Sequence, residues 1–68
     1  MEYNYVLTTE YDGKPYGLHR IVDFTDAAQV WGMCKDSGNA KEFATYTMTD
    51  PTGRSFTKTF YAKAVQNV

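Results

Sequence analysis

Two turn signals, each set between segments of alternating apolar and polar residues, constrain this chain more than any other feature. Asp12 and Gly13 tolerate the positive φ angles that a tight hairpin requires. The segment 50–53, Asp-Pro-Thr-Gly, combines an Asp that can bond its own backbone, a Pro that presets φ and a Gly that relieves strain. The sequence therefore predicts two β-hairpins.

Segments with the period of a β-strand flank both turns. In the first, Tyr5 and Leu7 share one side and alternate with mostly polar residues, which is typical of a half-buried strand. The second places His19 and Ile21 opposite its more apolar side, and the alternation in the third does not show which face is buried. We predict strands over residues about 2–11, 16–24, 41–49 and 54–65.

The segment between the two hairpins has the period of a helix. Thr25 is a suitable N-cap because its hydroxyl can accept from a first-turn amide, and Asp26 suits the positive end of the helix dipole. Gly38 and Asn39 supply the left-handed conformation that commonly ends a helix. We predict a helix over residues about 26–37. Its apolar stripe consists of Ala27, Val30, Trp31 and Cys34.

These elements predict a single α+β domain over residues 1–68, with the order ββαββ and a four-stranded, mainly antiparallel sheet packed on one helix. If the crossover is right-handed and strands one and four meet in the middle, the strand order is 2-1-4-3, as in β-grasp domains. The opening MEYNYVL, the Asp-Gly-Lys turn, the Asp-Ala-Ala helix start and the aromatic third strand resemble the small immunoglobulin-binding domains of bacterial surface proteins. The resemblance implies an architecture and no binding motif.

Size and charge exclude several classes of function. A chain of 68 residues buries only about 60% of its unfolded surface, so a roomy enclosed active site would compete with the core. Seven Lys or Arg against eight Asp or Glu exclude a strongly basic nucleic-acid module and a densely acidic DNA mimic. We expect the protein to act through its surface.

Residue types that carry catalysis are sparse. One cysteine, Cys34, and one histidine, His19, cannot form a structural zinc site, and on a regular strand His19 and Asp23 lie about 13 Å apart. No phosphate-binding glycine motif is present. We predict no catalytic residue, metal or cofactor, and hence no enzyme. A single thiol on the apolar side of the helix and the lack of an apolar segment of membrane-spanning length favour the cytoplasm and no membrane partner.

Aromatic residues are the most informative surface feature. The chain has eleven of them, and one helix covers only one face of a sheet, so some must lie on the open face or at the edges. Interfaces are enriched in such residues, although ordinary cross-strand pairs explain them equally well. The candidate partner-binding residues are Val6, His19, Ile21, Tyr61, Lys63 and Arg54.

We therefore expect a non-enzymatic protein-binding module. Domains of this size without catalytic residues suit a bacteriophage or bacterial accessory protein that binds and inhibits or redirects a larger host protein. One alternative is a nucleic-acid-binding domain in which Tyr61 stacks on a base while Lys41, Arg54, Lys58 and Lys63 meet phosphates. Others are a homodimeric structural protein, edge pairing by strand 41–49, and an enzyme subunit completed by a partner.

Overall fold

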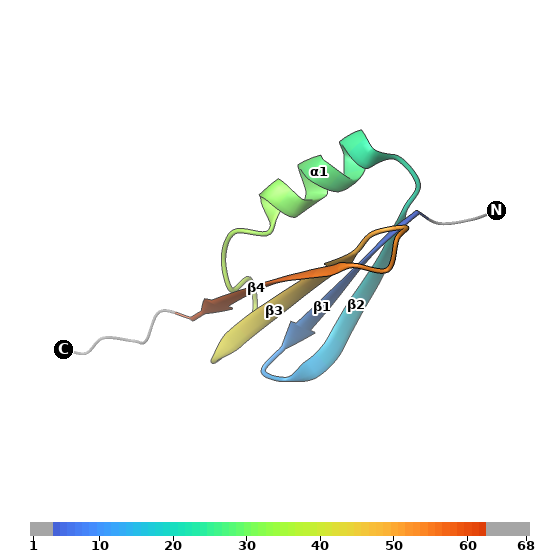
Figure 1. The fold of residues 1–68 in the computed structure, drawn as a ribbon. Coiled ribbons are helices and arrows are strands. Elements are labelled where there is room, and N and C mark those ends of the chain that lie inside the picture. The colour runs from blue at the N-terminus through green and yellow to red at the C-terminus, as the bar shows by residue number, and fades with distance from the viewer. Residues whose placement is uncertain (1–3, 63–68) are drawn as a thin grey trace.

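A four-stranded antiparallel sheet carries one helix across one of its faces (Figure 1). The computed structural model describes residues 4–62. This is the α+β fold with the order ββαββ that the sequence predicts. The elements are β1 (Tyr5–Tyr11), β2 (Lys14–Ile21), α1 (Phe24–Met33), β3 (Phe43–Thr49) and β4 (Ser55–Tyr61).

The strand order is β2-β1-β3-β4, so the predicted order 2-1-4-3 is wrong. Strand β1 pairs with β3 instead of β4, and every neighbouring pair is antiparallel. The segment from β2 through α1 to β3 therefore crosses over β1. Strand β3 lies inside the sheet, so the expectation that 41–49 is an edge is also wrong.

Asp12 explains why β3 lies beside β1. This residue has a φ of 57°, and its carboxylate accepts from the main-chain N–H groups of Lys41 at 3.0 Å, Glu42 at 2.6 Å and Phe43 at 3.1 Å. Its own N–H donates to the carbonyl of Phe43 at 2.8 Å. These four bonds fix the start of β3 next to the end of β1. The main-chain donors of Lys41 and Glu42 lower the pKa of Asp12 below its ordinary value of 3.8.

The helix is shorter than predicted and begins earlier. Asp23 is the N-cap in place of Thr25, and Cys34 is the C-cap, so the segment after Met33 is loop instead of helix. The ammonium group of Lys58 donates to the carbonyls of Trp31 at 2.8 Å and Cys34 at 3.3 Å. A cation from β4 thus satisfies the end of the helix, a contact that local sequence does not show.

The strands also differ from prediction at their ends. Strand β2 runs from Lys14 to Ile21 and excludes residues 22–24, β3 begins two residues later than expected, and β4 ends at Tyr61. The predicted residues 2–3 and 63–65 lie outside the part of the chain that the structure describes.

The core lies between the helix and one sheet face. Its buried members are Leu7, Ile21, Ala27, Cys34, Ala44, Tyr46 and Met48. Ile21 lies opposite Tyr5, and His19 lies opposite Leu7, so both are on the helix side. Their assignment to the open face is wrong. The alternation in β2 predicts that Leu18 faces the helix, but Leu18 is 56% exposed and Ile21 is buried.

Threonines dominate the open face of the sheet. Residues directly opposite each other across the strands share a face, so Thr8, Thr47 and Thr57 form one row. Thr45 and Thr59 belong to the next row, and Phe43 pairs with Tyr61 at a ring-centroid distance of 6.2 Å. The mixed aromatic surface expected there is confined to this one pair and single residues.

Candidate functional site

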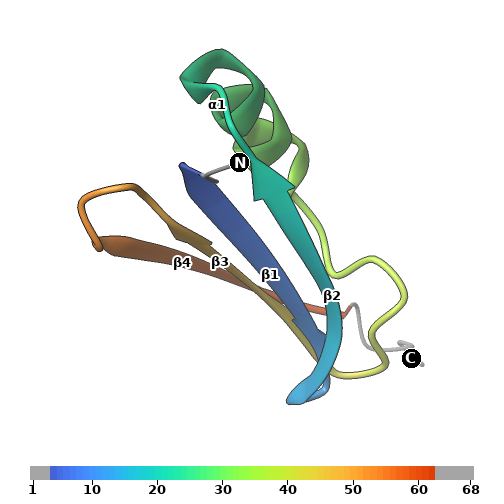
Figure 2. The ribbon, with the colours of Figure 1, turned by 90° about the vertical axis from the view of Figure 1, so that its right-hand side faces the viewer.

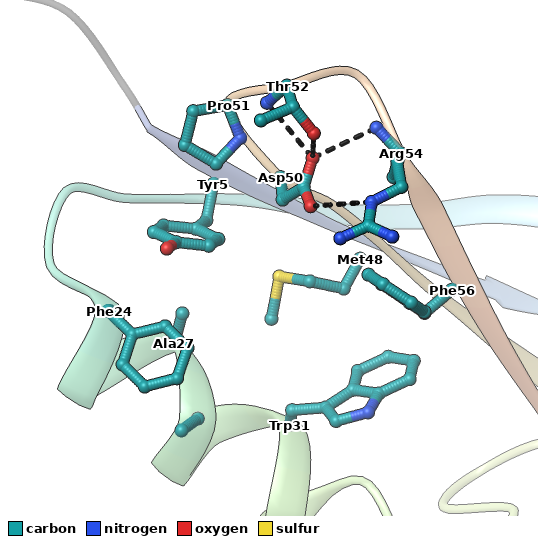
Figure 3. Close-up of a pocket in the computed structure, with 11 residues that line it drawn as sticks. Tyr5, Phe24, Ala27, Trp31, Met48, Asp50, Pro51, Thr52, Arg54 and Phe56 are labelled. Carbon is teal, nitrogen blue, oxygen red and sulfur yellow. Dashed lines mark hydrogen bonds and ion pairs between the residues drawn. The ribbon is translucent and has the colours of Figure 1, made fainter.

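An apolar cleft opens between the N-terminal part of α1 and the turn that joins β3 to β4 (Figure 3). Its volume is about 550 Å³, within the range typical of ligand pockets. Tyr5, Phe24, Ala27, Ala28, Trp31, Met48, Asp50, Pro51, Thr52, Arg54 and Phe56 line it.

The position of the helix creates this cleft. Figure 2 shows α1 above the ends of β1 and β2, while the β3–β4 turn lies apart from it on the other side. Lys58 joins β4 to the C-terminal end of the helix, and its ammonium lies 4.5 Å from the ring centroid of Trp31. No such tie joins the first turn of the helix to the 50–54 turn in the described chain.

The apolar walls of the cleft are incompletely covered. Phe24 from the helix is 67% exposed and Phe56 from β4 is 48% exposed. Trp31, from the helix, is half-buried, and Met48, from β3, is buried. The ring of Phe24 is tilted against that of Tyr5, with centroids 6.1 Å apart. Covering neighbouring exposed aromatic side chains with another apolar group is favourable, so such a surface marks a candidate binding site.

The rim of the cleft is polar and rigid. One oxygen of Asp50 accepts from the Thr52 hydroxyl at 2.7 Å, the Thr52 N–H at 3.0 Å and the Arg54 N–H at 2.9 Å. The Thr52 hydroxyl, followed by the main-chain donors of Arg54 and Thr52, lowers the pKa of Asp50 below its ordinary value of 3.8. The turn therefore holds itself in one conformation without help from the helix.

Arg54 provides a charge at this rim. Its side chain is 76% exposed, and its Nε lies 3.8 Å from the second oxygen of Asp50, a long contact for an ion pair. Its guanidinium carbon lies 6.0 Å from the ring centroid of Phe56. An anionic group bound beside Phe56 would therefore meet Arg54.

The six predicted partner-binding residues do not form one site. Val6 and Tyr61 do lie on the open face, but at different positions along it, and Arg54 lies at the rim of the cleft. Ile21 belongs to the core, His19 is exposed on the helix side of β2, and Lys63 lies outside the described residues.

The sequence alone does not show the cleft, to which Trp31 and Phe56 both belong. Their apolar spacing on the helix and on β4 indicates the helix–sheet interface correctly. It does not reveal how far apart the helix and the 50–54 turn lie. Phe24 was assigned to a strand, although it begins the helix.

The proposed nucleic-acid cations are also separated. Lys58 is engaged by the helix carbonyls and the Trp31 ring. Lys41 precedes the first residue of β3 and Arg54 follows the turn after its last, so these two lie at opposite ends of the sheet. Arg54 and Lys58 share one side of β4, but the ammonium of Lys58 is bound to the helix, so the three described cations do not form one exposed basic patch.

Cys34 is buried, as the sequence predicts, and its Sγ lies 3.4 Å from the carbonyl of Val30. Burial raises the pKa of this thiol above its ordinary value of 9.0, which opposes nucleophilic reactivity. Residues 4–62 contain no group of three His, Cys, Asp or Glu side chains placed to hold a metal ion. Over the same residues, no helix has the length and apolarity to cross a membrane.

Comparisons of the chain with protein-family models, with curated proteins and with solved structures find no match in any of the three. The chemistry of the cleft is therefore the basis for a proposed function.

Proposed function

We propose that this protein is a non-enzymatic binding module that holds an apolar segment of a larger protein in the cleft beside α1. The observation that carries the proposal is the exposure of Phe24 from the helix and Phe56 from β4, which line one cleft together with Trp31. Fully burying one such side chain contributes about 1.5–3 kcal/mol. A few aromatic anchors of this kind supply most of the free energy in many interfaces.

The position of Arg54 favours a protein partner that carries a carboxylate close to the apolar side chain held in the cleft. The guanidinium is exposed at the rim and makes only a long contact with Asp50. A planar guanidinium binds a carboxylate through two parallel hydrogen bonds. Binding by occupation of a surface is also how an accessory protein would inhibit or redirect a host protein, and the buried free thiol of Cys34 suits action in a reducing cytoplasm.

Capture experiments with matched variants test this proposal. The tagged full chain and its variants Phe24→Asp, Phe56→Glu and Tyr61→Asp are each incubated with bacterial lysate, with and without nuclease. Tyr61 is 74% exposed but lies on the opposite sheet face, so its variant is the control. We expect a stoichiometric protein that the wild-type chain and the Tyr61 variant retain and both cleft variants lose.

Other outcomes contradict the proposal. Retention by all four chains would place the binding surface elsewhere, and recovery of nuclease-sensitive material alone would favour nucleic-acid binding. Light scattering of each chain identifies self-association: a wild-type dimer that the cleft variants convert to monomer would make a second copy the occupant. Melting curves confirm that each variant is folded.

A further inference from the structure

We infer that the partner segment binds as an extended strand on the free edge of β4, with acidic and apolar side chains alternating toward the helix. This inference rests on the proposed function and specifies the chemistry of the partner. Strand addition of this kind gains affinity from main-chain hydrogen bonds and specificity from alternate side chains.

Within residues 4–62, the main chain of β4 pairs with another strand on one side only. The N–H of Asp50 donates to the carbonyl of Arg54 at 2.9 Å, and that of Ala62 donates to the carbonyl of Glu42 at 2.8 Å. In an antiparallel pair both main-chain groups of a residue point the same way and alternate along the strand. Even-numbered residues therefore face β3. The odd-numbered residues Ser55, Thr57, Thr59 and Tyr61 point their N–H and C=O groups away from the sheet.

The two edges of the sheet differ in their protection. In β2, Pro15 has no N–H to offer, and the pairing with β1 is irregular between Thr9 and Glu10. Proline and bulges are two of the devices that prevent a partner strand from adding to an edge. Strand β4 contains no proline, and its register with β3 is unbroken from Ser55 to Tyr61. The β4 edge is therefore the one suited to extension.

Side chains on the helix side of β4 define the complementary strand. Phe56 lies there opposite Met48, Lys58 opposite Tyr46 and Phe60 opposite Ala44, and Arg54 precedes them in the same phase. Cations and aromatics thus alternate. Because opposite charges and paired apolar residues stabilise cross-strand neighbours, the added strand places acidic residues beside Arg54 and Lys58 and apolar residues beside Phe56 and Phe60.

The cleft and the edge are continuous. Phe56 belongs to both, so an apolar side chain placed beside it enters the cleft that Trp31 and Phe24 line. The ammonium of Lys58 has three donors and uses two of them on helix carbonyls. An acidic neighbour can accept from the third without breaking the tie to the helix.

A second copy of this chain is a poorer occupant. Antiparallel pairing of two β4 strands about their midpoint would set two Lys58 side chains directly opposite each other. Like charges in that position are destabilising. Charge thus favours a strand of another protein with the opposite sign.

The probe is a displayed library of random peptides of about eight residues, a common strand length. The immobilised full chain selects binders, and binders to Phe24→Asp are removed by prior subtraction. Selected peptides are synthesised and scanned by N-methylation of one backbone amide at a time. We expect acidic and apolar residues to alternate, and methylation to weaken binding by about tenfold at alternate amides only.

Variants of the edge provide the matched test. Thr57→Pro removes one outward N–H and leaves the bonds to β3 intact, whereas Thr57→Val keeps both the N–H and the branched shape. The selected peptide should lose about tenfold in affinity for the proline variant and remain unchanged for the valine variant. If the proline variant does not fold, the N-methylation scan decides the question without it.

Failure of this inference differs from failure of the proposed function. Peptides that require Phe24 and Phe56 but show no alternation in the N-methylation scan would keep the cleft and overturn strand addition. Peptides with basic residues in place of acidic ones would overturn the charge pattern. A library that yields no binder to the wild-type chain above the Phe24→Asp background would count against both.

Discussion

Each end of the helix–sheet layer contains a hairpin turn with an aspartate, but the carboxylates of the two aspartates bind different parts of the chain. At the closed end, made by the Asp12 turn and the 34–42 loop, the carboxylate accepts from residues 29 to 31 positions away. At the open end, made by the 50–54 turn and the first turn of α1, the Asp50 carboxylate accepts, within the described part of the chain, only from residues two and four positions away.

Further contacts of the 34–42 loop strengthen the closed end. The hydroxyl of Tyr46 donates to the carbonyl of Asp36 at 3.0 Å, and Gly38 lies against the ring of Tyr11. Among the described residues, the hydrogen bonds of the 50–54 turn lie within the turn and its hairpin. The internal bonds of the 50–54 turn therefore order it without connecting it to α1. Both ends are hollowed, but differently: the cleft at the open end is lined mainly by apolar and aromatic side chains, whereas the hollow of about 560 Å³ beside the 34–42 loop is lined mainly by the polar residues 35–39. The apolar cleft therefore lies where the polar bonds of the turn are local.

Trp31 connects the two ends, and its removal should have the largest effect. Trp31→Ala deletes an indole that packs on the core and lies under the Lys58 ammonium. We expect a loss of about 3 kcal/mol in the free energy of unfolding, from a total of roughly 3–10 kcal/mol for a chain of this length. Urea denaturation measures it. A loss below about 1 kcal/mol would show that the helix is not held through this residue.

Gly38 tests the closed end directly. Its φ is 56°, and an added Cβ would lie 2.7 Å from the Tyr11 hydroxyl oxygen and 3.3 Å from the adjoining ring carbon. Gly38→Ala should cost about 2 kcal/mol, because it combines left-handed strain with displacement of Tyr11. Gly32→Ala is the matched control, since its Cβ meets nothing within 4 Å. That control should gain about 0.5–1 kcal/mol in the helix. Equal effects in the two variants would refute the packing argument.

Lys58 tests the tie between β4 and the helix. Lys58→Met keeps an apolar stem over Trp31 but removes the bonds to the carbonyls of Trp31 and Cys34. We expect a loss of about 1–2 kcal/mol, since hydrogen bonds from charged groups contribute more than neutral ones. Lys35→Met, at an exposed position, should change stability little. Thermal melts of both variants check this, and similar melting temperatures would contradict it.

The contribution of the Asp12 carboxylate to the stability of the fold should depend on pH. Its pKa is lowered in the folded state, so its stabilising effect is fully present above the ordinary value of 3.8 and is lost as the pH falls through the lowered value. Asp12→Asn keeps one acceptor oxygen, so we expect a moderate loss at neutral pH and a smaller difference from wild type in acid. Melting temperatures of both proteins, measured from about pH 7 to about pH 2, cover the range in which the Asp12 carboxylate becomes protonated. A difference that does not shrink in acid would contradict the assignment.

Asp12 also shows where prediction from sequence stops. The Asp-Gly pair predicts the hairpin correctly, and the alternation in 41–49 predicts a strand. No local pattern shows that the same carboxylate selects β3 as the neighbour of β1, so the predicted order failed. Likewise the alternation of β2 suggested that Leu18 was buried, whereas Ile21 is the residue that the helix covers. Local propensity identifies elements, but contacts distant in sequence decide their arrangement and thereby the cleft.

Phe24 at the open end should show the smallest effect on stability and the largest on binding. It is the first residue of α1 and is 67% exposed, so Phe24→Asp removes little buried surface. A carboxylate in the first turn of a helix is favoured by the dipole, by about 0.3–1 kcal/mol, which offsets the lost contact with Tyr5. We expect an unfolding free energy within about 0.5 kcal/mol of wild type together with loss of the captured partner. A clear drop in the free energy of unfolding would mean that Phe24 stabilises the fold as a core residue. The open end would then be part of the core and not a binding surface.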